Sequence, residues 1–114
     1  MAVKLNDEAL TRARDLVKDG KVVRDERDDW SEHAPSTEEQ NKFIEDKNWH
    51  EYGLWHLGID TDQSAETKGR YSFPFGDFSK VHRCAVISLE SRAAQNDHDD
   101  ILTATKNLLK LIDS

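Results

Sequence analysis

The sequence of 114 residues contains a single cysteine, Cys84. A disulfide within the chain needs two cysteines, so the cysteine content gives no sign of an oxidising compartment. Proline and glycine are scarce, at two and five residues, and no apolar run approaches the roughly 20 residues of a transmembrane helix. The N-terminal segment lacks the apolar core of a signal peptide. We therefore expect a cytoplasmic protein with no membrane contact.

Basic residues are also in deficit, with 16 Lys and Arg against 23 Asp and Glu and a net charge of −7. Non-specific binding to nucleic acid requires a basic surface, so this balance disfavours it. Aromatic residues make up 8% of the chain and include three Trp, which indicates a folded protein rather than a disordered one. A chain of this length is expected to form one domain, residues 1–114, around one modest core.

Apolar residues recur at helical spacing in five segments, and a capping residue or a glycine marks most of their ends. The predicted helices cover residues 6–19, 36–46, 48–58, 78–94 and 100–112. The clearest start is at Ser36, because Ser36 and Glu39 have the spacing of a capping box. We expect Phe43 and Ile44 to be buried in this helix. Asp77 is predicted to cap the helix over 78–94.

The segments between these helices carry turn residues, charge runs and one aromatic block. Residues 21–24 predict a short extended piece, 24–29 a solvated connector, 59–69 an acidic loop and 71–76 a short strand or extended turn. The elements together predict a mainly α fold, a compact bundle of four to five short helices with an extended aromatic loop at 71–76.

The stretch from Lys68 to Arg92 is basic in an acidic chain, with five basic and two acidic residues. Its cations lie on both sides of the predicted helix start at Asp77, where a helix N-terminus favours anions. Ile87 falls among the polar positions of that helix, which suggests an apolar contact. We call the resulting candidate binding site the predicted basic surface; it comprises Lys68, Arg70, Tyr71, Lys80, Arg83 and Ile87.

Three alternatives compete at this surface. Its cations can pair internally with the acidic remainder of the chain. They can also bind phosphate or nucleic acid, with Tyr71, Phe73 or Phe75 stacking on bases. The third alternative is an enzyme that uses His82 and Cys84. Cys84 is predicted to lie mid-helix, however, away from the helix end that activates a thiol.

Five histidines raise the question of a metal site. No His-x-x-x-His or Cys-x-x-Cys pair is present, so we expect no metal and no other cofactor. His82 falls on the apolar face of the predicted helix, where a hydrogen-bonded core histidine is expected. If it is buried, it should resist protonation, and acid should destabilise the fold.

Several segments carry a resemblance to known proteins. They are Val22-Val-Arg-Asp-Glu-Arg, Trp55-His-Leu-Gly-Ile-Asp, Lys68-Gly-Arg-Tyr-Ser-Phe-Pro-Phe-Gly-Asp-Phe and Lys80-Val-His-Arg-Cys. With them the chain resembles, over nearly its full length, a family of small uncharacterised bacterial proteins. Residues 60–95 are loosely similar to a segment of bacteriophage prohead and capsid-associated proteins. That segment also has an acidic loop, Lys-x-x-Tyr (here Lys68 and Tyr71), a proline and an alanine-rich helix. The resemblance implies one structural unit over 68–95, and no activity, cofactor or site.

We therefore predict a small, acidic, non-enzymatic interaction protein that acts through the predicted basic surface. The expected partner is a macromolecule, in the first place another protein, with a second copy of the chain as a further possibility. Electrostatics would favour a partner with acidic groups facing the predicted basic surface and basic groups facing the acidic remainder of the chain.

Overall fold

A computed structural model of the chain describes residues 3–25, 30 and 34–114. Within these residues the strands form two small sheets. In the first sheet, β1 (Val3–Leu5) and β4 (Tyr71–Pro74) each pair antiparallel with the central strand β3 (His56–Asp60). In the second, β2 (Val22–Val23) pairs parallel with β5 (Val81–His82).

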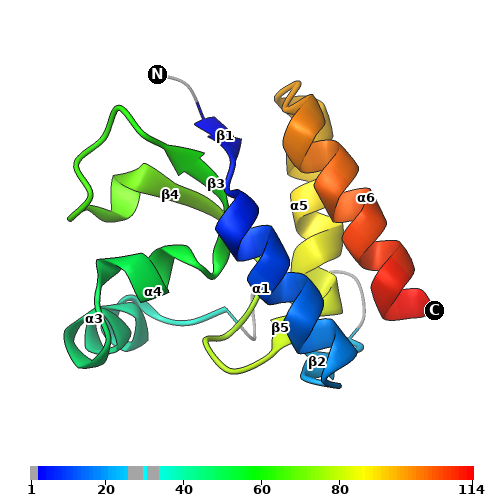
Figure 1. The fold of residues 1–114 in the computed structure, drawn as a ribbon, viewed down its shortest axis with the longest axis horizontal. Coiled ribbons are helices and arrows are strands. Elements are labelled where there is room, and N and C mark those ends of the chain that lie inside the picture. Colours follow the sequence, from blue (N-terminus) through cyan, green and yellow to red (C-terminus); the bar gives the residue numbers. More distant parts are fainter. Residues whose placement is uncertain (1–2, 26–29, 31–33) are drawn as a thin grey trace.

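Helices pack on both sides of the first sheet (Figure 1). They are α1 (Asp7–Lys18), α3 (Thr37–Asp46), α4 (Trp49–Gly53), α5 (Arg83–Gln95) and α6 (Asp99–Asp113), with a 3₁₀ turn η1 (Lys68–Arg70) before β4. Figure 1 shows α1 between the sheet and the α5–α6 pair, with α3 and α4 below the sheet in this view. The core lies where α1, α5 and α6 meet the sheet, and its largest fully buried side chains include Phe75, Leu57, Leu89, Ile101 and Leu108.

The predicted mainly α bundle is wrong, because the chain has an α+β arrangement with two sheets. The physical reason is the length and pairing of the strands. They run from two to five residues, too short for an alternating pattern to stand out. The pairings of β1 with β3 and of β2 with β5 also join segments that are far apart in sequence. Two extended segments were anticipated: β2 confirms the short piece at 21–24, and β4 confirms the aromatic segment at 71–76.

The predicted helix over 78–94 begins later, at Arg83. Asp77 does not cap it: its Oδ1 accepts from the backbone amides of Ser79 and Lys80, at 3.0 and 2.7 Å, and closes a turn. Phe78 has φ +70°, which is incompatible with a helix. Val81 and His82, which were also predicted to be helical, form β5. Local capping chemistry was identified correctly, but it serves a turn instead of a helix.

The predicted helix over 48–58 is also shorter than expected. Asn48 caps it as predicted, accepting from the Glu51 amide at 2.8 Å, but α4 ends at Gly53. Gly58 is not a helix stop; it lies within β3, where an added Cβ would come within 2.5 Å of Ser72 Oγ. This glycine lets the neighbouring strand approach closely.

The remaining helices confirm the sequence interpretation closely. The 6–19 and 100–112 predictions correspond to α1 and α6, and the capping box of Ser36 and Glu39 is formed at the start of α3. Phe43 and Ile44 are only half-buried, however, because no residue of α3 is fully covered. Across the described residues, none of the helices combines the length and apolar character needed to cross a bilayer.

Candidate functional site

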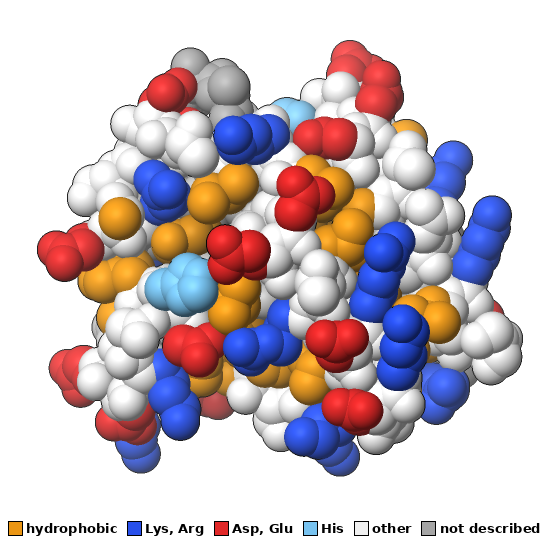
Figure 2. All heavy atoms as spheres, viewed as in Figure 1, with side chains coloured by type: hydrophobic (Ala, Val, Ile, Leu, Met, Phe, Trp, Pro, Cys, Tyr) orange, Lys and Arg blue, Asp and Glu red, His pale blue; other side chains and the backbone are white. Residues whose placement is uncertain are grey.

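The structure separates the residues of the predicted basic surface. Lys68 and Arg70 lie in η1, between β3 and β4 of the first sheet, whereas Lys80 and Arg83 flank β5 in the second sheet. Arg83 forms a bidentate pair with Asp113, at 2.8 and 3.2 Å. Figure 2 likewise shows Lys and Arg side chains spread among Asp and Glu on this face.

The other members of that surface also have internal roles. The Arg70 guanidinium donates to the Gln63 carbonyl at 2.8 Å and lies 6.0 Å from the centre of the Tyr71 ring. Tyr71 and Ile87 are half-buried. Phe73 and Phe75 are buried, so their faces do not present a stacking platform for bases. The described residues therefore show no single cationic platform.

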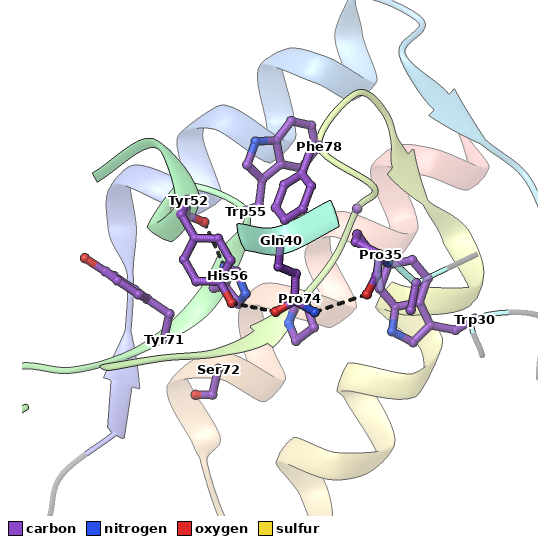
Figure 3. Close-up of a pocket in the computed structure, with 12 residues that line it drawn as sticks. Trp30, Pro35, Gln40, Tyr52, Trp55, His56, Tyr71, Ser72, Pro74 and Phe78 are labelled. Atoms are coloured by element: carbon purple, nitrogen blue, oxygen red, sulfur yellow. Dashed lines mark hydrogen bonds between the residues drawn. The ribbon is translucent and has the colours of Figure 1, made fainter. Parts of the chain in front are cut away.

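A cavity of about 220 Å³ lies instead between α3, α4, β3 and β4 and the turn after β4 (Figure 3). We call it the aromatic cavity, because its walls are mostly rings, those of Trp30, Tyr52, Trp55, His56, Tyr71 and Phe78. Tyr52 lies at the centre of this group, with ring centroids 4.5 Å from His56 and 5.9 Å from both Tyr71 and Phe78. The cavity therefore offers a mostly apolar surface of aromatic rings tilted against one another.

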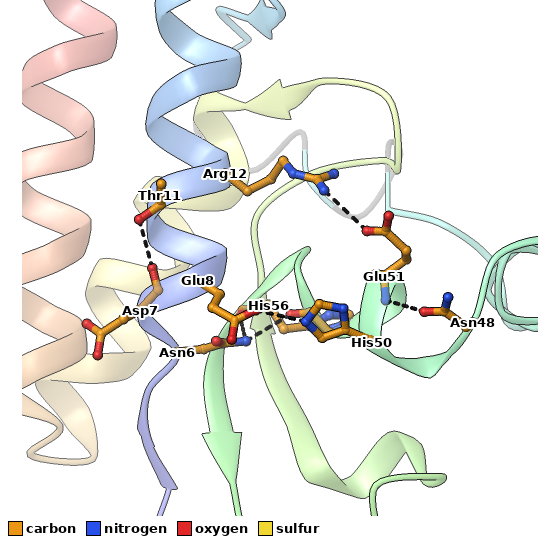
Figure 4. Close-up of polar contacts among 10 residues, drawn as sticks. Asn6, Asp7, Glu8, Thr11, Arg12, Asn48, His50, Glu51 and His56 are labelled. Atoms are coloured by element: carbon orange, nitrogen blue, oxygen red, sulfur yellow. Dashed lines mark hydrogen bonds and ion pairs between the residues drawn. The ribbon is translucent and has the colours of Figure 1, made fainter.

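Polar contacts to α1 hold the helix that supplies Tyr52 (Figure 4). The Asn6 side-chain amide donates to the backbone carbonyls of Gly53 and His56, at 3.1 and 3.3 Å. Arg12 pairs with Glu51 at 3.2 Å. The contact of His50 with Glu8 at 2.8 Å is largely exposed to solvent and adds little to this support. Asn6 thus joins both ends of the α4–β3 connection, and this fixes the cavity wall before any ligand arrives.

Most polar groups of the cavity wall already have partners. The Tyr52 hydroxyl donates to Gln40 Oε1 at 3.2 Å, and Gln40 Nε2 donates to the Pro35 carbonyl at 3.1 Å. Ser72 Oγ is buried without a partner among the described residues, but Figure 3 shows its hydroxyl pointing away from the rings. The cavity therefore has few sites at which a polar ligand atom can bond.

His56 provides such a site. Its Nδ1 lies 2.9 Å from the Tyr52 backbone carbonyl, and because a carbonyl only accepts, Nδ1 carries the proton. Burial lowers the pKa of His56 to about 4, although the bond to Tyr52 opposes this shift. The ring is therefore neutral at pH 7, and Nε2 presents a lone pair. No hydrogen bond from a described residue reaches Nε2, so it can accept one from a ligand.

A second cluster surrounds His82, which is 3% exposed. Nδ1 lies 2.8 Å from Asp25 Oδ2, and Nε2 lies 2.7 Å from Asp77 Oδ2. The other oxygen of Asp25 accepts from the Cys84 backbone amide at 2.8 Å, in the first turn of α5. We call Asp25, Asp77, His82 and Cys84 the His82 cluster. It adjoins the aromatic cavity, since the rings of Trp30 and His82 are 5.6 Å apart.

The His82 cluster corrects two predictions. Burial alone would lower the pKa of His82, but hydrogen bonds and charges from Asp77 and Asp25 outweigh it and raise that pKa. Burial would likewise raise the pKa of each carboxyl, yet backbone amides and His82 leave both below their ordinary value. His82 is thus buried, as predicted, but its two carboxylate neighbours favour its protonated form instead of the neutral one. Cys84 is not mid-helix, because α5 begins one residue before it.

Sequence reasoning missed Asp25 and Gln40. Asp25 falls in the charge run that was predicted to be a solvated connector. In the structure Asp25 contacts His82, and Arg24 donates to the Ile112 carbonyl at 3.3 and 3.1 Å; residues 26–29 of that run lie outside the described residues. No local signal marks Asp25, because its partners are more than 50 positions away. Tyr52 and His56 fall within the helix predicted over 48–58, and the cavity beside them has no signature in sequence.

Comparison with known proteins gives no further assignment. No protein-family model matches the chain, and no curated protein or solved structure shows a significant similarity to it. The resemblance to small bacterial proteins and to the bacteriophage segment stays a prediction.

Proposed function

We propose that the protein is a non-enzymatic binding protein whose aromatic cavity receives one planar aromatic ring bearing a hydrogen-bond donor. The ring is presented by a partner protein, as a tyrosine or tryptophan side chain. The observation that carries the proposal is that Nε2 of neutral His56 receives no hydrogen bond from a described residue, in a wall that is half aromatic rings. This atom selects a ring with an O–H or N–H group over a purely apolar one.

The size of the cavity supports a single ring. Pockets for drug-sized ligands measure roughly 300–1,000 Å³, whereas an apolar cavity of about 150 Å³ holds benzene. At about 220 Å³ the aromatic cavity lies between these values. A phenol or an indole matches that space, and a nucleotide does not.

Charge and chemistry favour a protein as the source of the ring. Tyrosine and tryptophan are the residues that most often anchor protein interfaces. The net charge of −7 repels nucleic acid and favours a partner with basic residues around its aromatic anchor. A non-enzymatic role is supported by the His82 cluster, because both ring nitrogens of His82 face carboxylates.

The proposal is tested by titrating ¹⁵N-labelled protein with p-cresol, 3-methylindole and toluene while recording amide shifts. We expect shifts around Tyr52, His56 and Tyr71, with p-cresol and 3-methylindole binding at least about fivefold tighter than toluene, the worth of one neutral hydrogen bond. His56→Phe should remove this preference while toluene still binds. His50→Phe, which changes an exposed histidine, should leave the preference intact.

A partner protein is distinguished from a free small molecule by competition. Proteins captured from a lysate on immobilised wild-type chain should be released by excess p-cresol if they occupy the cavity. Binding of p-cresol without any cresol-sensitive partner would point to a free phenol or indole as the ligand. Equal affinity for toluene and p-cresol, or no binding of any ring, would overturn the proposal.

A further inference from the structure

We propose that Asp25, His82 and Cys84 form a binding site for a divalent transition metal ion of the zinc type. One ligand atom of each residue, a carboxylate oxygen, an imidazole nitrogen and the thiol sulfur, lies within 4.8 Å of the other two. His82 and Cys84 are almost fully buried, and the Asp25 side chain is 7% exposed. This site is separate from the aromatic cavity in residues and in ligand chemistry.

The donor set fits zinc better than it fits magnesium or calcium. Thiolate and imidazole ligands suit Zn²⁺ and its neighbours in the transition series, whereas the two hard cations take oxygen ligands. Zinc bonds of about 2.0–2.3 Å in a tetrahedron place ligand atoms roughly 3.5 Å apart. The longest of the three separations, within 4.8 Å, therefore has to shorten by up to about an ångström, while the hydrogen-bonded pair of His82 Nδ1 and Asp25 Oδ2, now at 2.8 Å, has to open slightly. Three protein ligands are also the number in zinc sites that keep a fourth position for water or another molecule.

The surroundings orient each ligand. Asp77 accepts from His82 at Nε2 and leaves Nδ1 directed at Asp25, which is the usual carboxylate–histidine support of a metal-binding imidazole. The Cys84 amide holds one Asp25 oxygen, so the other faces Nδ1. Cys84 itself lies in the first turn of α5, where the helix dipole favours a negative ligand. The parallel pairing of β2 with β5 brings the two segments together.

The exchange of protons for metal is balanced in charge. With the metal absent, Nδ1 and the Cys84 sulfur each carry a proton, and two carboxylates flank the imidazolium. The metal forms bonds to Nδ1, to the sulfur and to Asp25, and the two protons leave to solvent. The two positive charges of the metal ion replace those of the two departing protons, so the net charge of the buried site does not change. Metal binding therefore avoids the cost of burying an additional, unpaired charge. Nε2 keeps its proton and its bond to Asp77.

The experiment uses the full chain without an affinity tag, stripped with a chelator and titrated with Co²⁺ as a spectroscopic substitute for zinc. We expect one Co²⁺ per chain, a thiolate-to-cobalt charge-transfer band in the near ultraviolet, and loss of the band when Zn²⁺ is added. Cys84→Ser, a change of one atom, should abolish the band and weaken metal binding by at least about tenfold, the effect expected for losing a ligand or its support.

Two further variants distinguish metal binding at this site from nonspecific metal binding elsewhere on the chain. His50→Gln removes an exposed histidine that contacts a carboxylate at the same 2.8 Å distance as His82, and it should leave the titration unchanged. Asp77→Asn should weaken binding without removing the charge-transfer band. Folded wild-type protein that binds no Co²⁺, binds it without the band, or binds it equally after Cys84→Ser would overturn the proposal. Since the aromatic cavity is tested with rings and no metal, either proposal can fail alone.

Discussion

At the scale of single residues, two buried histidines differ in charge because of what surrounds them. His56 faces a carbonyl and aromatic rings, so burial dominates and its pKa falls to about 4. His82 is buried to a similar degree, but two carboxylates lie within 2.8 Å and raise its pKa. Burial alone therefore does not predict the charge of a histidine; the neighbouring charges decide it.

For His56 we predict a loss of stability in mild acid. The unfolded chain binds a proton near pH 6.5 and the folded chain only near pH 4, so protonation in this window favours unfolding. The stabilisation is complete above pH 6.5 and falls by about 3 kcal/mol as the pH approaches 4. Urea unfolding followed between pH 4 and 7 measures this change. His56→Gln should flatten the slope, and the exposed-site variant His50→Gln should preserve it.

For the His82 cluster we predict that Asp25→Asn, measured in the presence of a chelator, lowers the free energy of unfolding by about 3 kcal/mol at pH 6, because it leaves a buried charge underpaired. Asp113→Asn, which breaks the exposed pair with Arg83, should cause little measurable change. The raised pKa of His82 gives stability that is full below pH 6.5 and is lost as the pH rises through that pKa. The difference between wild type and Asp25→Asn should therefore shrink at high pH. A constant difference would contradict the charged state of His82.

The sequence identified His82 as a buried residue, and the structure confirms this. Its protonation state was predicted wrongly because Asp25 lies 57 positions away and carries no local sign of burial. An acid in a charge run usually lies in solvent. Only the strand pairing that brings residues 22–25 next to residues 81–84 distinguishes this one.

At the scale of elements, the turn from Gly76 to Lys80 decides where α5 begins. A Cβ added to Gly76 would lie 2.5 Å from the Lys80 carbonyl oxygen and 2.6 Å from the Trp55 ring. The carbonyl belongs to the backbone and cannot rotate away, so the clash needs a movement of the whole turn. Close approach, and not a special φ angle, makes glycine necessary at this position.

We therefore predict that Gly76→Ala lowers the free energy of unfolding by about 2 kcal/mol, within the range for overpacking a tight site. Gly69→Ala is the matched control, because its nearest neighbour would be 3.8 Å away, and it should change stability by less than about 0.5 kcal/mol. Chemical denaturation of both variants provides the comparison. Equal effects would show that the turn can adjust.

The elements predicted well are those whose signals are local. The capping box of α3 and the apolar stripes of α1 and α6 depend on residues within a turn or two, so sequence spacing is sufficient. The start of α5 was placed five residues too early because Asp77 has the chemistry of a cap. Its role as a turn residue depends on Val81 and His82 pairing with a distant strand, which spacing cannot show.

At the scale of the whole molecule, the α5–α6 pair provides much of the core. Leu108 is fully buried, whereas its neighbour Leu109 is only half-buried. We predict that Leu108→Ala costs about 3 kcal/mol through lost burial and a residual cavity, and that Leu109→Ala costs clearly less. The two variants remove the same atoms, so the difference between their urea midpoints, at unchanged slope, reports burial alone. Equal midpoints would contradict the assigned core.

The fold class could not be deduced from composition or periodicity. Helical periodicity extends over long segments and was detected, but the strands are short and find partners across the chain. The candidate sites depend on the same distant pairings, which is why the aromatic cavity and the His82 cluster became visible only in three dimensions.

The pairing of β2 with β5 also has a consequence for the order of events during folding. α5 and α6 are adjacent in sequence and can associate soon after each forms, whereas Asp25 meets His82 only after a loop of 57 positions has closed. Such closure costs entropy that increases with loop length and slows the contacts that depend on it. The His82 cluster is thus expected among the last parts of the molecule to assemble, and its formation would mark the arrival of the native state.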